Sequence, residues 1–121
     1  MSTLNVIAVS SNHLTGPFPE NGSFSLPALQ YIELSDNSFS GTIPQGLLAC
    51  RHLIELSLAK NSFEGVVPAW LGKLTNLQFI NVGWNDLTGP IPAQLSNLTG
   101  LNVMEIAFCN LKESFRQSLD G

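Results

Sequence analysis

Few side chains in this 121-residue chain could carry out catalysis or bind a metal. Cys50 and Cys109 are the two cysteines, and His13 and His52 are the two histidines. A nucleophile of the Cys–His or Ser–His–Asp type needs its partners within hydrogen-bond reach, and a zinc site needs several such ligands around one point. Whether these side chains can come within reach of one another depends on the strands, turns and helices that carry them.

An asparagine recurs at a nearly constant interval within a constant apolar frame. The frame is L-x-x-(L/I/M)-x-(L/V/I)-x-x-(N/C)-x-(L/F), and its polar position recurs after 25 residues once and then after 24 residues three times. A repeat of this period indicates a solenoid, which takes precedence over what the chain length alone would suggest. The repeated polar positions, which we call the ladder, are Asn12, Asn37, Asn61, Asn85 and Cys109.

The first half of each unit alternates apolar and polar residues, which predicts a short strand with one buried face. Parallel strands stacked at about 4.8 Å would bury those faces together. The ladder amide follows each strand and can both donate and accept hydrogen bonds, so we expect it to satisfy buried backbone groups and to link successive coils. The expected inward residues are Ile7, Val9, Ile32, Leu34, Leu56, Leu58, Ile80, Val82, Met104 and Ile106.

The second half of each unit contains a glycine and then a proline, as in FSGTIP from Phe39 and LTGPIP from Leu87. Glycine permits conformations closed to other residues, and proline fixes φ where a regular helix would start. Apolar residues such as Leu47, Leu71 and Leu95 follow, in the segment expected to lead the chain back along the convex side. The sequence predicts an α/β repeat: a right-handed coil of about five turns, with a short parallel β-sheet on the concave face and irregular or 3-10 convex segments.

The chain resembles the leucine-rich repeats of plant receptor kinases and receptor-like proteins, whose unit is L-x-x-L-x-L-x-x-N-x-L-x-G-x-I-P-x-x-L-x-x-L-x-x. The resemblance covers nearly all of residues 4–111, and the phrases VPAWLGKLTNL, GPIPAQLSNLTGL and CNL are most similar to ectodomains of the cereal immune receptor kinase subfamily. It implies a leucine-rich repeat solenoid at the extracellular face of the plasma membrane, in a glycoprotein that binds peptides, microbial molecules or a co-receptor. No kinase motif occurs in the chain.

The units begin near residues 4, 29, 53, 77 and 101, so residues 1–111 are assigned to the repeats. After Leu111 the expected glycine and proline are missing, and residues 112–121 form a degenerate half-repeat or a C-terminal tail. This tail is either a polar cap or the altered end of a gene. The cysteine-paired caps of the family are absent, so both ends expose apolar edges and we expect end-to-end self-association or low stability.

Within such a coil the potential catalytic groups stay apart. Glu33 and Glu105 share a column, but three strand spacings, about 14 Å, separate them, too far for the paired carboxylates of a glycosidase. Cys50 and Cys109 lie in buried columns of different units, too distant for a disulfide, and His13 and His52 occupy other columns. We expect no catalytic residue, no metal site, no cofactor and no enzymatic activity.

The composition excludes some partners. The chain has five basic and nine acidic residues, which gives a net charge of −4. No cluster of basic residues that could bind nucleic acid occurs in the sequence. No apolar stretch approaches the roughly 20 residues of a membrane span, and the start at Met1 lacks the features of a secretory signal. The sequence as it stands predicts a soluble, untargeted chain with no membrane span, whose parent protein the resemblance places at the membrane.

We expect binding at the outward strand positions, because packing does not fix their chemistry. Large aromatic side chains among them are typical anchors for a protein or peptide ligand or a co-receptor. Two sequons, at Asn21 and Asn97, are candidates for glycosylation on the convex or loop side. The candidate ligand-binding residues are Tyr31, Glu33, Asp36, Glu55, Lys60, Phe79, Asn81, Trp84, Glu105 and Phe108.

Three functions remain open at this point. The leading one is a recognition segment of a plant receptor in defence or developmental signalling. The second is a stand-alone binding protein similar to the polygalacturonase inhibitors, and the third is a truncated gene product without a ligand of its own.

Overall fold

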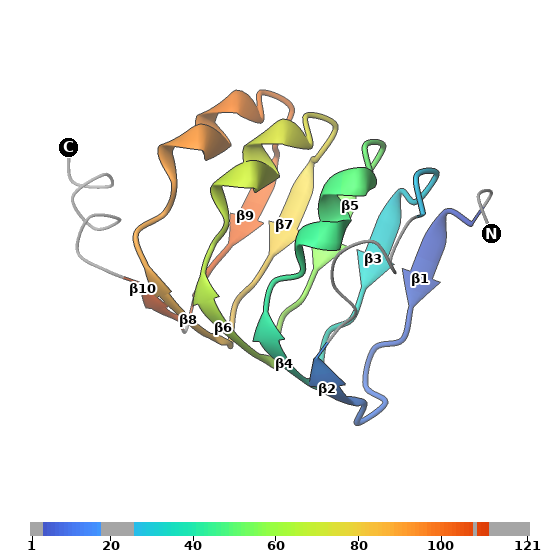
Figure 1. The fold of residues 1–121 in the computed structure, drawn as a ribbon, viewed down its shortest axis with the longest axis vertical. Coiled ribbons are helices and arrows are strands. Elements are labelled where there is room, and N and C mark those ends of the chain that lie inside the picture. Colours follow the sequence, from blue (N-terminus) through green and yellow to red (C-terminus); the bar gives the residue numbers. More distant parts are fainter. Residues whose placement is uncertain (1–3, 18–25, 108, 112–121) are drawn as a thin grey trace.

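The computed structural model describes residues 4–17, 26–107 and 109–111. In this part of the chain the backbone winds as a solenoid, and successive coils lie side by side (Figure 1). A complete coil passes through a strand of one sheet, a strand of a second sheet and a 3-10 segment. The predicted leucine-rich repeat solenoid is confirmed.

The first sheet is parallel and contains the strands that alternation predicts. Its order is β1-β3-β5-β7-β9, so each strand pairs with the strand one unit away. The register keeps equivalent residues side by side; Tyr31 pairs with Glu55, and Glu55 pairs with Phe79. The strands are β1 (Val6–Ala8), β3 (Tyr31–Glu33), β5 (Glu55–Ser57), β7 (Phe79–Asn81) and β9 (Val103–Glu105).

A second parallel sheet, which the sequence analysis did not anticipate, follows the ladder residues. Its order is β10-β8-β6-β4-β2. Each glycine of the repeat lies in or beside these strands, with φ of 84° at Gly65 and 81° at Gly89, in the region that favours glycine. The strands are β2 (Thr15–Pro17), β4 (Ser38–Thr42), β6 (Ser62–Val66), β8 (Asp86–Gly89) and β10 (Asn110–Leu111).

Short 3-10 helices form the returning side, as predicted. They are η2 (Gln45–Ala49), η3 (Ala69–Lys73) and η4 (Ala93–Asn97), and each follows a proline in extended conformation. Gly72 in η3 allows the next coil to approach, because a Cβ built there would lie 2.3 Å from the backbone oxygen of Gln94. The close spacing of η3 and η4 therefore depends on this glycine.

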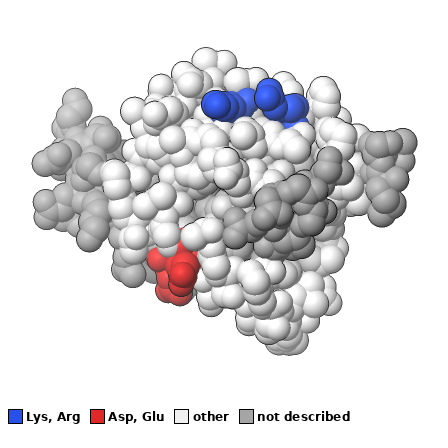
Figure 2. All heavy atoms as spheres, in the orientation of Figure 1, with Lys and Arg blue, Asp and Glu red and all other residues white. Residues whose placement is uncertain are grey.

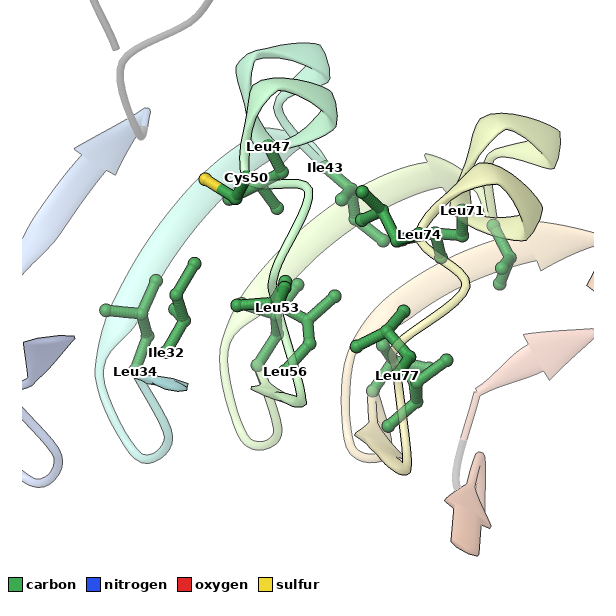
Figure 3. Close-up of a cluster of buried hydrophobic side chains, with 14 of the residues drawn as sticks. Ile32, Leu34, Ile43, Leu47, Cys50, Leu53, Leu56, Leu71, Leu74 and Leu77 are labelled. Atoms are coloured by element: carbon green, nitrogen blue, oxygen red, sulfur yellow. The ribbon is translucent and has the colours of Figure 1, made fainter. Parts of the chain in front are cut away.

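The core lies between the two sheets and the 3-10 helices. The inward residues of the middle coils are buried as predicted, whereas Ile7, Val9, Met104 and Ile106 of the outer coils are only partly buried. The rings of Phe39 and Phe63 stack with their centroids 6.3 Å apart. Figure 3 shows how the apolar side chains of neighbouring coils meet in rows, including Ile32, Leu34, Leu47, Leu53, Leu56, Leu71, Leu74 and Leu77.

The ladder links the coils as predicted. Asn85 Nδ2 donates to the carbonyl oxygens of Val82 and Gly83 in its own coil and of Leu58 in the preceding coil, while its Oδ1 accepts from the Phe63 N–H. Asn61 repeats the backward link with a 3.0 Å bond to the Leu34 carbonyl. The amides of Asn37, Asn61 and Asn85 therefore satisfy a turn and tie it to the coil before it.

Candidate functional site

The outer face of the first sheet, which we call the concave face, displays most of the predicted binding residues. The alternation in β3 is clear: Tyr31 is 38% exposed, Ile32 is fully buried and Glu33 is half-buried. Pleating sends successive side chains to opposite faces, so the buried residue supports its two neighbours. The predicted separation of inward and outward residues is thus confirmed here.

One row across the concave face alternates aromatic and acidic side chains. The strand register places Glu55 directly between Tyr31 and Phe79, and Val103 continues the row at 44% exposure. Glu55 and Phe79 are half-buried. Neighbouring strands lie about 4.8 Å apart, so a carboxylate here has an aromatic ring on each side.

The next row contains Glu33, Ser57, Asn81 and Glu105. All of these side chains except that of Ser57 accept a hydrogen bond from the backbone. Glu33 accepts a hydrogen bond from the Ser35 N–H at 3.0 Å, and Asn81 Oδ1 accepts from the Gly83 N–H at 3.1 Å. Glu105 has the same contact with the residue two positions later. Glu33, Asn81 and Glu105 therefore also have a structural role, because their side-chain oxygens accept hydrogen bonds from the turn that follows each strand.

A group of serines surrounds Glu33. Partial burial raises the pKa of this carboxyl, but hydrogen bonds from Ser35, Ser10 and Ser57 outweigh that effect and leave its pKa below the usual value. The hydroxyls of Ser35 and Ser57 also meet at 2.7 Å, and Ser57 is only 3% exposed. Glu33 is therefore a positioned carboxylate. Sequence reasoning missed the serines, although Ser10 and Ser35 occupy the same place two residues before the ladder position.

The residue before each ladder asparagine forms a third row at the end of the strands. Asp36, Lys60 and Trp84 have φ of 60°, 57° and 56°, a left-handed conformation that is uncommon outside glycine. All three are exposed, Trp84 by 52%. Asp36 accepts a hydrogen bond from the Ser11 hydroxyl at 2.9 Å. Phe108, the expected fourth member, lies outside the described residues.

The two cysteines are free thiols in separate places. Cys50 is fully buried at the end of η2, and desolvation raises its pKa to about 11. Cys109 is only partly buried, contrary to the prediction, and its coil is the last one in the described part of the chain. Burial also raises the pKa of Cys109, so neither thiol has the lowered pKa of a nucleophile.

Several other predictions concern groups beyond the concave face. Asn97 is exposed at the end of η4, whereas Asn21 lies outside the described residues. In the part of the chain that the structure describes, no three His, Cys, Asp or Glu side chains group as metal ligands. The described residues also form no helix that is long and apolar enough to span a membrane.

The solenoid is similar to solved structures of plant receptors. The chain is 34% identical to the Arabidopsis receptor kinase HAESA in its complex with the peptide hormone IDA and the co-receptor SERK1, with a TM-score of 0.84 over 90% of this chain and 18% of that chain. It is 33% identical to the plant peptide hormone receptor RGFR1 in complex with RGF2, with a TM-score of 0.84 over 89% of this chain and 17% of that one.

A third similar structure is the BIR3–SERK2 complex from Arabidopsis thaliana, at 33% identity and a TM-score of 0.82, covering 88% of this chain and 56% of that chain. The chain thus spans between 17% and 56% of the length of these three structures. A search of curated proteins gave no significant match. The leucine-rich repeat family model matches residues 28–50, 52–74 and 76–98, more than half of the chain, and its repeats have the same fold as those of plant receptor ectodomains. The chain belongs to the leucine-rich repeat family, in the form found in plant receptor-like proteins.

Proposed function

We propose that this chain is a non-enzymatic recognition segment of a plant leucine-rich repeat receptor, and that it binds a peptide or protein through its concave face. The observation that carries the proposal is the exposure of aromatic side chains on that face and in the row that ends its strands, with Tyr31 at 38% and Trp84 at 52%. Folding does not require these rings to be apolar, and exposed aromatic residues are frequent anchors of binding partners.

The neighbouring structures support a partner of this class. HAESA is in a complex with the peptide hormone IDA and the co-receptor SERK1, and RGFR1 is in a complex with RGF2. We therefore place the chain at the extracellular face, in defence or developmental signalling, with a peptide ligand or a co-receptor as its partner. The concave sheet suits an extended ligand, because its rows of equivalent side chains run across five strands.

Selection from a random peptide library displayed on phage tests this proposal. Peptides selected on the immobilised chain are synthesised, and their affinities for the unmodified protein and two variants are measured. Trp84→Gly removes the ring at a position whose φ of 56° glycine adopts readily, so the backbone is preserved. The control is Val66→Thr, which changes a side chain of similar exposure, 54%, on the second sheet.

We expect Trp84→Gly to weaken binding by about tenfold or more, as for an aromatic anchor, and Val66→Thr to leave it unchanged. Circular dichroism and a melting curve confirm that both variants fold. If no selected peptide loses affinity in Trp84→Gly or in a second variant, Tyr31→Ala, the concave face is not the binding surface and the proposal fails.

A further inference from the structure

Charged side chains are distributed unevenly over the described surface. Four carboxylates, Glu33, Asp36, Glu55 and Glu105, belong to the concave face and the row that ends its strands, where Lys60 is the single described cation. The other described cations, Arg51 and Lys73, lie at the 3-10 side. Figure 2 shows blue side chains along the upper edge, over the 3-10 segments, and a separate red patch lower on the same face. The concave face with the row that ends its strands therefore has the larger share of the described carboxylates, while Glu64 and Asp86 lie on the second sheet.

Glu55 is placed where a cation would have two kinds of partner. The register sets it between Tyr31 on one neighbouring strand and Phe79 on the other, so the two aromatic residues are about 10 Å apart with the carboxylate between them. Ammonium and guanidinium groups bind carboxylates as ion pairs and the faces of aromatic rings by cation–π attraction. A neutral or anionic side chain would gain neither contact here.

Glu33 adds a second fixed negative charge beside this row. It lies two residues after Tyr31 in β3, on the same face and about 7 Å along the strand. The Ser35 N–H holds its carboxylate in place, so the charge needs no rearrangement when a ligand arrives. Lys60 belongs to the row beyond the strand ends. The row formed by Tyr31, Glu55 and Phe79 therefore contains no cation.

We infer, on the basis of the proposed function, that the partner of this face is an extended, positively charged peptide segment, with a Lys or Arg side chain beside the Tyr31 and Phe79 rings against the Glu55 carboxylate. Charge complementarity of this kind sets specificity and accelerates association. The side chains on one side of the extended peptide then face the outward residues of the concave face.

Two synthetic pools of fluorescent peptides, each of about ten residues, test the inference. Both pools have the same random positions; three alternate positions are Lys or Arg in one pool and Asp or Glu in the other. Fluorescence anisotropy measures binding to the unmodified chain, to Glu55→Gln and to the double variant Glu33→Gln/Glu55→Gln. The matched control, Glu64→Gln/Asp86→Asn, removes the same total charge from two exposed, register-paired residues of the second sheet.

We expect the cationic pool to bind about tenfold more tightly than the anionic pool, and the affinity to fall as NaCl rises from about 50 to about 300 mM. The double variant should lose about tenfold for the cationic pool, Glu55→Gln should lose part of this, and the control pair should lose little. Melting curves establish that each variant is folded.

Three outcomes would overturn the inference. Equal losses in the double variant and the control would show that binding follows total charge only. Tighter binding of the anionic pool, with Trp84→Gly still weakening it, would reject the cationic partner and leave the proposed function standing. Failure of both pools, together with no concave-face binder from the phage library, would reject both.

Discussion

The thiol of Cys109 donates a hydrogen bond to the backbone carbonyl oxygen of Val82, with an Sγ–O distance of 3.2 Å. Asn85 makes the equivalent backward bond to Leu58 at 2.9 Å. The cysteine therefore preserves the link between coils although the asparagine is lost. Asn85 also accepts a hydrogen bond from the Phe63 N–H through its amide oxygen, and a cysteine has no such oxygen. The last described coil therefore keeps the donor part of the ladder and loses the acceptor part.

Replacing this cysteine by asparagine should stabilise the protein. Cys109→Asn would place an amide oxygen where it can accept from the Leu87 N–H, and we expect the free energy of unfolding to rise by about 1 kcal/mol. Cys109→Ala should lower it by a similar amount, because the bond to Val82 is lost. Urea unfolding followed by circular dichroism measures both. Equal stabilities of the asparagine and alanine variants would contradict this account of the ladder.

The importance of a ladder asparagine should depend on its coil. Asn85 is only 7% exposed and its amide takes part in four hydrogen bonds, so Asn85→Ala should lower the free energy of unfolding by about 3 kcal/mol. Asn12 is exposed in the first described coil, and water can replace its bonds to Val9 and Ser10. We expect Asn12→Ala to cost less than about 1 kcal/mol. Equal losses at the two positions in urea unfolding would show that burial does not set the ladder's contribution.

Gly72 should be the least replaceable glycine of the convex side. Gly72→Ala would place a Cβ 2.3 Å from the Gln94 carbonyl oxygen, so η3 and η4 must separate. We expect a loss of about 2 kcal/mol in the free energy of unfolding. The control is Gly100→Ala, where a Cβ meets no atom within 4 Å. Similar melting temperatures for both variants would show that the coils do not depend on the contact.

Glu33 should make stability depend on pH in the acid range. Its pKa in the folded chain is below the ordinary value of 4.5, so its contribution is present above that value and is lost as the pH falls through the folded pKa. Glu33→Gln removes the titrating group. The stability difference between the native chain and this variant should be constant near pH 6 and should shrink as the pH falls below 4.5. A difference independent of pH in urea titrations would contradict the hydrogen-bonded carboxylate.

The sequence predicted the coil because each unit repeats its packing. The alternation around Ile32 and Leu56 arises within single strands, and the structure confirms that both residues are buried. The side-chain amides of Asn37 and Asn61 donate to the turns of their own coils, as expected. The second sheet was missed because a segment such as Phe39-Ser40-Gly41 contains one apolar residue and a glycine, which suggests a turn. Its strands form only because equivalent segments of adjacent coils pair with each other.

The concave face was predicted in position but only partly in chemistry. Tyr31 and Trp84 are exposed as expected. Alternation in β3 sets the direction of Tyr31, whereas Trp84 follows β7 and has a left-handed φ of 56°. The environment of Glu33 could not be predicted, because Ser10 and Ser57 reach it from the preceding and following coils. The contacts of Glu33 with Ser10 and Ser57 depend on small residues more than 20 positions away in sequence. The repeat pattern does not specify the residue type at those positions.

The most direct test of the central claim is an NMR titration of the isotope-labelled chain with a peptide selected on it. If the concave face is the recognition surface, the largest amide shift changes will occur at Tyr31–Glu33, Glu55–Ser57 and Phe79–Asn81. The second-sheet strands Ser38–Thr42 and Ser62–Val66 should change little. Changes concentrated in those strands or in the 3-10 helices would contradict the claim.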